Sequence, residues 1–171
     1  MSINPISNNN ELSKNTQIKA TLKATKQRRA LKRCRTINLK IQKNKLNKQQ
    51  LEHLFMLFVE AKWIYNHILN DIKNRANDSY VKLLKEIEIP YQDKLIIKPL
   101  KFISSQMKQS IATQVKSNLI VLSELKKKGH KVGRLKFKSF INSINLKQYK
   151  ITHRIDFKSN KISIQGIKKD I

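Results

Sequence analysis

The stretch NKQQLEHLFMLFVEAKWIYNHILNDIKNRA, residues 47 to 76, constrains the fold most, because its apolar residues recur at intervals of three and four. This spacing places them on one stripe of a helix of about six turns. Asn47 with Gln50 three residues later resembles a capping box, so we expect the helix to begin there. Trp63 and Asn66 lie partly off the stripe and are either ligand contacts or a second packing edge. The stripe consists of Leu51, Leu54, Phe55, Phe58, Ala61, Ile64, Tyr65, Ile68 and Ile72.

A stripe of this length needs an apolar partner, and residues 100 to 128 supply a second helical pattern. Gly129 is placed to end that second helix, and Lys126 to Lys128 suit its negative C-terminal end. Between the two long helices, residues 79 to 89 predict a shorter helix that ends before Pro90, and residues 90 to 99 a connector. The second stripe contains Ile103, Met107, Ile111, Val115, Leu119, Leu122 and Leu125.

Elsewhere the apolar period is two, which is typical of half-buried strands. One such pattern precedes the helices in TINLKI, residues 36 to 41, and others follow the glycines. The sequence therefore predicts an α+β fold, in which long helices at about 47 to 128 are inserted into a small antiparallel β unit. The order is strand, helical section, then about three strands, with helix-only and swapped-strand folds as alternatives. The alternating residues are Ile37, Leu39 and Ile41, then Leu135 and Phe137, then Ile151, Ile155 and Phe157, and, after a turn at 158 to 161, Ile162 and Ile164.

The first 34 residues are polar, rich in Asn and Ser in their first half, and without periodicity. Such a segment cannot bury enough apolar surface to offset its ordering entropy, so we expect a disordered basic arm at 1 to 34 and a single domain at 35 to 171. The run KATKQRRALKRCR, residues 23 to 35, carries seven basic residues in thirteen. It is either a helix that lies on a phosphate backbone or a solvated basic tail.

Charge points to the partner. Thirty-seven basic and eleven acidic side chains give a formal charge of +26, which attracts a polyanion strongly. We expect DNA or structured RNA and not a membrane, because the lysines are spread through the chain and no apolar run reaches about 18 residues. With no signal-peptide core at its N-terminus, we expect the chain in the cytoplasm. Aromatic residues make up 6% of the chain, too few for an extended base-stacking platform, so Gln106 or Gln109 are the candidate readers of base edges.

No catalytic pattern is recognisable. Cys34 is the single cysteine, and the four histidines never occur at the i, i+4 spacing of helical metal ligands. Acidic residues such as Glu60 lie in helical patterns, where a solvated role is usual, and no phosphate-binding loop or nucleophile motif is present. We therefore expect a binding module that is not an enzyme, with no metal and no cofactor.

The order of these elements, together with several short sequence motifs, resembles that of a known family. TINLKI, a Gln-containing helix start and AKWIYNHIL, followed by KFISSQMKQSI and KKKGHKVGRLKFKS, are similar to TnpB/OrfB proteins, the transposon-encoded RNA-guided DNA nucleases. The resemblance covers about residues 35 to 167. The family commonly has an aromatic residue and proline where this chain has Arg134 and Leu135. The family's RuvC carboxylates and zinc-ribbon cysteines have no counterpart in this sequence.

The resemblance implies the wedge and recognition part of such a nuclease, which holds guide RNA and helps to read a short motif beside the DNA target. By position, Lys101, Phe102 and Gln106 would contribute to that reading. Together with the basic runs, the candidate nucleic-acid-binding residues are Arg28, Arg29, Arg33, Arg35, Lys101, Phe102, Gln106, Lys126, Lys127, Lys128, Lys131, Arg134, Lys136 and Lys138.

Three functional hypotheses follow. The chain is a TnpB-like nucleic-acid-binding protein, or it works with a catalytic chain supplied separately, or it is a basic RNA- or ribosome-associated protein unrelated to transposition. In the first two, KKKGHKVGRLKFKSF, residues 126 to 140, is a joint at which the helical section becomes the β wedge.

Overall fold

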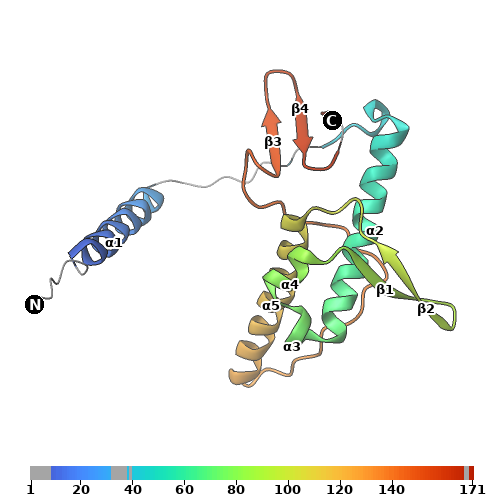
Figure 1. Cartoon of the computed structure of the whole chain (residues 1–171), viewed down its shortest axis with the longest axis horizontal. Helices are drawn as coiled ribbons and strands as arrows, with labels where there is room; N and C mark the ends of the chain where they lie inside the picture. The colour runs from blue at the N-terminus through green and yellow to red at the C-terminus, as the bar shows by residue number, and fades with distance from the viewer. Residues whose placement is uncertain (1–8, 32–37, 39, 168–169) are drawn as a thin grey trace, which may run out of the picture. The chain divides into compact units, whose positions relative to one another are not determined.

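The computed structural model describes residues 9–31, 38, 40–167 and 170–171, which fall into two compact units, Met1–Lys40 and Ile41–Ile171. Small antiparallel sheets accompany the helices, which confirms the predicted α+β class. The first unit contains α1 (Asn9–Ala30). In chain order, the second contains a 3-10 turn (Lys43–Lys45), α2 (Lys48–Asn70), α3 (Ile72–Arg75), α4 (Asp78–Leu83), β1 (Glu86–Tyr91), β2 (Lys94–Pro99), α5 (Ser105–Lys127), β3 (His153–Asp156) and β4 (Lys161–Ile164) (Figure 1).

Helix α1 differs from the expected unstructured arm. Its described side chains, from Lys14 onward, are exposed, apart from a half-buried Thr25. Ala, Lys, Arg, Leu and Gln make up nine of the eleven residues from Ala20 to Ala30, and these residues have high intrinsic helix propensity, so helix geometry here needs no apolar stripe. Residues 23 to 30 are therefore helical.

Helix α2 begins with the predicted capping box. Asn47 Oδ1 accepts a hydrogen bond from the Gln50 backbone N–H (2.8 Å), and Gln50 Oε1 accepts one from the Asn47 N–H (3.0 Å). The buried stripe runs through Leu57, Ala61, Ile64, Tyr65 and Ile68. At its start the prediction was wrong, because Leu51 and Phe55 are 43% and 67% exposed.

Helix α5 packs against α2 and α4. Ser104 caps its start, and Ile103, Met107, Ile111 and Val115 are buried as predicted. Gly129, at a φ of +81°, ends the helix as predicted. Its N–H donates to the Lys126 carbonyl (3.0 Å), and the His130 N–H donates to the Leu125 carbonyl (3.1 Å), the pair of bonds that defines a Schellman motif.

A β-hairpin replaces part of the predicted short helix and the connector. Helix α4 ends at Leu83, and β1 pairs with β2 in an antiparallel register from Glu86↔Pro99 to Tyr91↔Lys94. The alternation of isoleucines with Glu86 and Glu88 is a strand pattern, and Ile87 is buried against the core at 2% exposure. Pro90 is tolerated because both strands of a two-stranded sheet are edge strands.

The C-terminal strands were predicted in part. β3 and β4 pair as an antiparallel hairpin around the expected turn. The strand predicted through Leu135 and Phe137 is not formed, because no described strand lies beside this extended segment to pair with it. Of the strand predicted at 36 to 41, residues 36, 37 and 39 lie outside the described residues, and Asn38, Lys40 and Ile41 are in no strand. The described residues thus form two separate hairpins in place of one β unit.

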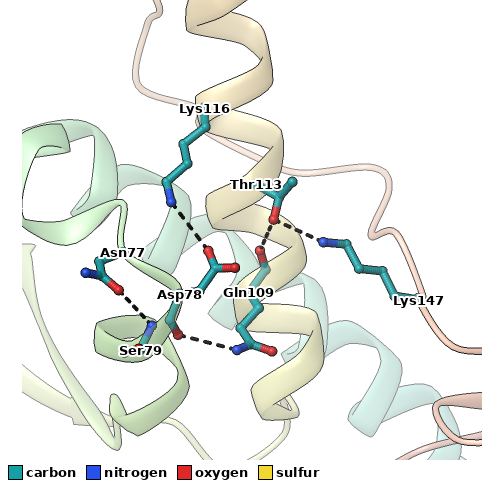
Figure 2. A network of polar contacts seen from close by, with 7 residues as sticks. All are labelled: Asn77, Asp78, Ser79, Gln109, Thr113, Lys116 and Lys147. Carbon is teal, nitrogen blue, oxygen red and sulfur yellow. Dashed lines mark hydrogen bonds and ion pairs between the residues drawn. The ribbon is translucent and has the colours of Figure 1, made fainter. Parts of the chain in front are cut away.

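A polar network joins α4, α5 and Lys147, which lies in the irregular stretch between α5 and β3 (Figure 2). Lys116 forms an ion pair with Asp78 (3.5 Å), and the Gln109 amide donates to the Asp78 carbonyl (3.5 Å). Lys147 donates to the Thr113 hydroxyl (3.0 Å), which donates to the Gln109 carbonyl (2.8 Å). Gln109, one of the two predicted base readers, is therefore engaged within the fold.

Candidate nucleic-acid interface

The loop that enters α5 is built on a buried carboxylate. Glu60, on α2, is 1% exposed. Its Oε1 accepts the Lys101 N–H (2.8 Å), and its Oε2 accepts the N–H groups of Phe102 and Ile103 (both 2.9 Å). Three charge-assisted hydrogen bonds from consecutive residues fix the path of this loop. The expectation of a solvated Glu60 was therefore wrong.

The sequence did hold a signal for this role. Glu60 lies three residues after Leu57 and four before Ile64, inside the buried stripe of α2. A carboxylate at a core position must find hydrogen-bond donors, because an unpaired buried charge is very costly. The donors come from the β2–α5 connection, which is about forty residues away in the chain.

A buried lysine, Lys108, lies one turn after Ser104, the residue that caps the start of α5. Lys108 is 6% exposed, and its ammonium donates to the Leu84 carbonyl at the end of α4. Burial lowers the pKa of Lys108, and the negative charge of Glu60 acts in the opposite direction. Lys108 therefore belongs to the interior and adds nothing to the external cationic surface.

The resemblance placed Lys101, Phe102 and Gln106 at a motif-reading site, and the structure brings the three to the start of α5. Lys101 is exposed. Phe102 is half-buried and packs edge-to-face on His53, with 4.9 Å between ring centroids. The Gln106 amide donates to the Gln148 side chain (2.6 Å). Of the three, Lys101 is the one whose side chain extends freely from the loop.

Seven basic residues and no acidic residue occupy positions 126 to 138, which we call the cationic segment. Lys126 to Lys128 form the last turn and cap of α5, and the chain then continues as an exposed extended stretch. The Schellman cap at Gly129 sets the direction in which this stretch leaves the helix. All seven candidates in it are exposed: Lys126, Lys127, Lys128, Lys131, Arg134, Lys136 and Lys138.

The far end of the cationic segment is fastened to α2. Asn66 Nδ2 donates to the Lys138 carbonyl and Asn66 Oδ1 accepts the Lys138 N–H, both at 2.9 Å. A side-chain amide here satisfies the two backbone groups that a neighbouring strand would otherwise pair. The Lys138 ammonium lies 4.6 Å from the centre of the Tyr65 ring, a cation–π contact. Of the two alternatives for Asn66, the structure has the packing edge.

Two further candidates belong to the other unit. Arg28 and Arg29 form the last turn of α1, and both side chains are exposed. Arg33 and Arg35 lie outside the described residues, as does Cys34.

Few of the basic side chains that the structure describes form ion pairs within the fold. Over the described ranges only two ion pairs form, Lys116 with Asp78 (3.5 Å) and Lys127 with Glu124 (3.1 Å). Both pairs are exposed, and such pairs contribute little to stability. The surface of the described residues therefore keeps most of its positive charge.

Within the part of the chain that the structure describes, no cluster of three or more His, Cys, Asp or Glu side chains has the arrangement of a metal site. In the same residues, no helix has both the length and the apolar character to cross a bilayer. No protein-family model, curated protein or solved structure matches the chain.

Proposed function

We propose that this chain is a nucleic-acid-binding protein, the DNA- and guide-RNA-binding part of a TnpB-like system without a catalytic site of its own. The observation that carries the proposal is the cationic segment, which has seven basic and no acidic side chains, a helix cap at Gly129 and an anchor to Asn66 at Lys138. Fixing both ends lowers the conformational entropy that is given up when a phosphate backbone is bound.

The chemistry is neutralisation of phosphates. Each lysine or arginine that contacts a phosphate releases a condensed counterion, so affinity falls as salt rises. Lys101 adds a cation on a loop held by Glu60, and the resemblance supports a contact with a short duplex motif at this loop. In this scheme the protein recognises charge and shape, and base pairing between the guide RNA and the target strand recognises sequence.

The test is the salt dependence of binding to duplex DNA and to a structured RNA, measured by fluorescence anisotropy. Replacing Lys126, Lys127, Lys128 and Lys131 together by Ala should weaken binding and reduce the slope of log K against log salt by about 0.9 for each phosphate that is no longer neutralised. The matched control removes the same charge elsewhere, with Ala at four exposed lysines around α4 and the β1–β2 hairpin: Lys82, Lys85, Lys94 and Lys98.

An unchanged slope in the first variant would place the footprint away from the cationic segment. If the parent protein bound neither nucleic acid at moderate salt, the proposal would be withdrawn. Co-purification with ribosomal subunits, and not with one small RNA, would favour a basic RNA- or ribosome-associated protein unrelated to transposition.

A further inference from the structure

A groove of about 480 Å³ lies between the outer face of α2, the β1–β2 hairpin and the end of the cationic segment. Its volume falls within the range of about 300–1,000 Å³ that is usual for sites of small ligands. In Figure 1, β1 lies beside the C-terminal half of α2, and the two elements are in contact. Because Phe137 and Lys138 line this groove, it continues the cationic segment directly.

The groove has apolar walls that are left uncovered. Trp63 is half-buried on α2, where its inner side packs against the core. Two other lining residues are more exposed, Phe137 at 63% and Leu95, on β2, at 69%. Large apolar side chains gathered on a concave surface indicate a binding site more often than isolated exposed ones do.

The rim is cationic. Lys62, Arg75 and Lys138 line the groove with a single carboxylate, Glu88, so three positive charges minus one negative charge leave a formal charge of +2. The Arg75 guanidinium is held in place because it donates to the His67 carbonyl (3.3 Å) and lies 3.3 Å from His67 Nδ1. The Lys138 backbone is held by Asn66. The site is therefore largely preorganised.

We propose that this groove takes one unpaired base of a single-stranded nucleic acid, stacked on Trp63, with the adjoining phosphates on Lys62 and Lys138. The inference rests on the proposed function and narrows it to strands that offer an unpaired nucleotide. Aromatic faces accept any base, so the site selects single strands without reading their sequence. One such position needs a single indole in the groove, which agrees with the low aromatic content of the chain.

A phosphate backbone is favoured over a peptide as the occupant for two reasons. The rim carries net positive charge, and a strand that follows the cationic segment past Arg134 and Lys136 is led directly to Phe137 and Lys138. An apolar peptide would bring no anionic group to Lys62, Arg75 and Lys138 and would gain nothing from the cationic segment.

Trp63 is the only tryptophan of the chain, so its fluorescence reports this groove alone. The full chain is titrated at low salt with a twelve-nucleotide oligothymidylate, with a blunt-ended two-strand duplex that has no unpaired base and with an oligoaspartate peptide of equal charge. Anisotropy of labelled probes measures binding separately. We expect the single strand to quench indole emission as it binds, and the duplex to bind without this quenching.

The matched variants separate stacking from charge. Trp63→Leu should lower the affinity for oligothymidylate by about fivefold to a hundredfold, the effect of removing one stacked base, while duplex affinity changes little. Trp63→Phe should restore most of that affinity. Phe55→Leu, at an exposed aromatic residue elsewhere on α2, is the control and should change neither affinity. Phe137→Ala, at another exposed residue, should also weaken single-strand binding and gives a second measurement if Trp63→Leu does not fold.

The outcomes are distinguishable. If oligothymidylate binds without quenching, or if Phe137→Ala and Trp63→Leu bind it as the parent does, the groove is not a base site, although the proposed function stands. Quenching by oligoaspartate but not by oligothymidylate would likewise overturn the inference and make an acidic peptide the occupant. If no nucleic acid binds at all, the proposed function fails first.

Discussion

The Glu60 carboxylate gives the sharpest test of how the fold holds its candidate interface. Glu60→Gln conserves the volume of the side chain but replaces one acceptor oxygen with an NH₂ donor. Because Oε1 and Oε2 together accept three N–H groups, at least one of these buried or part-buried donors must then face another donor. An unsatisfied buried donor costs about 1–3 kcal/mol, and the bonds that survive lose their charge assistance. We expect the free energy of unfolding to fall by about 2–4 kcal/mol.

Thermal unfolding followed by circular dichroism measures this change. At about 4 °C per kcal/mol for a domain of this size, the Tm should fall by roughly 8–16 °C. Glu52→Gln is the matched control, since Glu52 lies on the same helix and is exposed, and its Tm should match that of the parent. A Tm for Glu60→Gln within about 1 °C of the parent would refute the reasoning, because it would mean that the three N–H groups do not depend on this carboxylate.

Three more predictions follow from single sites. Ile64→Ala, at a fully buried position of α2, should lower the free energy of unfolding by about 2–5 kcal/mol in a urea titration; an unchanged midpoint would place the core elsewhere. Gly129→Ala should lower the free energy of unfolding by about 1–2 kcal/mol, because Gly129 has a φ of +81°. Gly133→Ala should leave it unchanged, because Gly133 does not have a positive φ and, as at Gly129, an added Cβ would meet no neighbour. Equal melting curves for the two variants would contradict this reasoning. Burial, and then the charge of Arg75, lower the pKa of His67 below its ordinary 6.5, so the folded state binds this proton less readily than the unfolded state. Stability should therefore be complete above about pH 6.5 and fall on acidification below it, a decrease that His67→Gln should reduce when urea midpoints are compared at pH 7.5 and 5.5.

The candidate interface was predictable as a set of charges but not as a surface. The run at 126 to 138 and its glycine are visible in the sequence, and the helix ends at Gly129 as predicted. The anchor of this run on Asn66 was not predictable, since it joins residues 72 positions apart and replaces a strand pairing with a side-chain amide. The groove beside Trp63 depends on the β1–β2 hairpin, whose residues the sequence pattern divided between a helix and a connector.

What the sequence determined by itself is local: the stripes and caps of α2 and α5, the turn of the β3–β4 hairpin, and the charge of +26. These follow from the period of the apolar residues and from hydrogen bonds between residues a few positions apart. Both depend only on the local sequence and not on the rest of the fold. Only the tertiary structure decided which carboxylate is buried, which alternating segment finds a pairing partner and which aromatic ring lines a groove. Each of those outcomes depends on which distant backbone arrives beside the residue, because a buried polar group or an extended strand is stable only where such a partner is present.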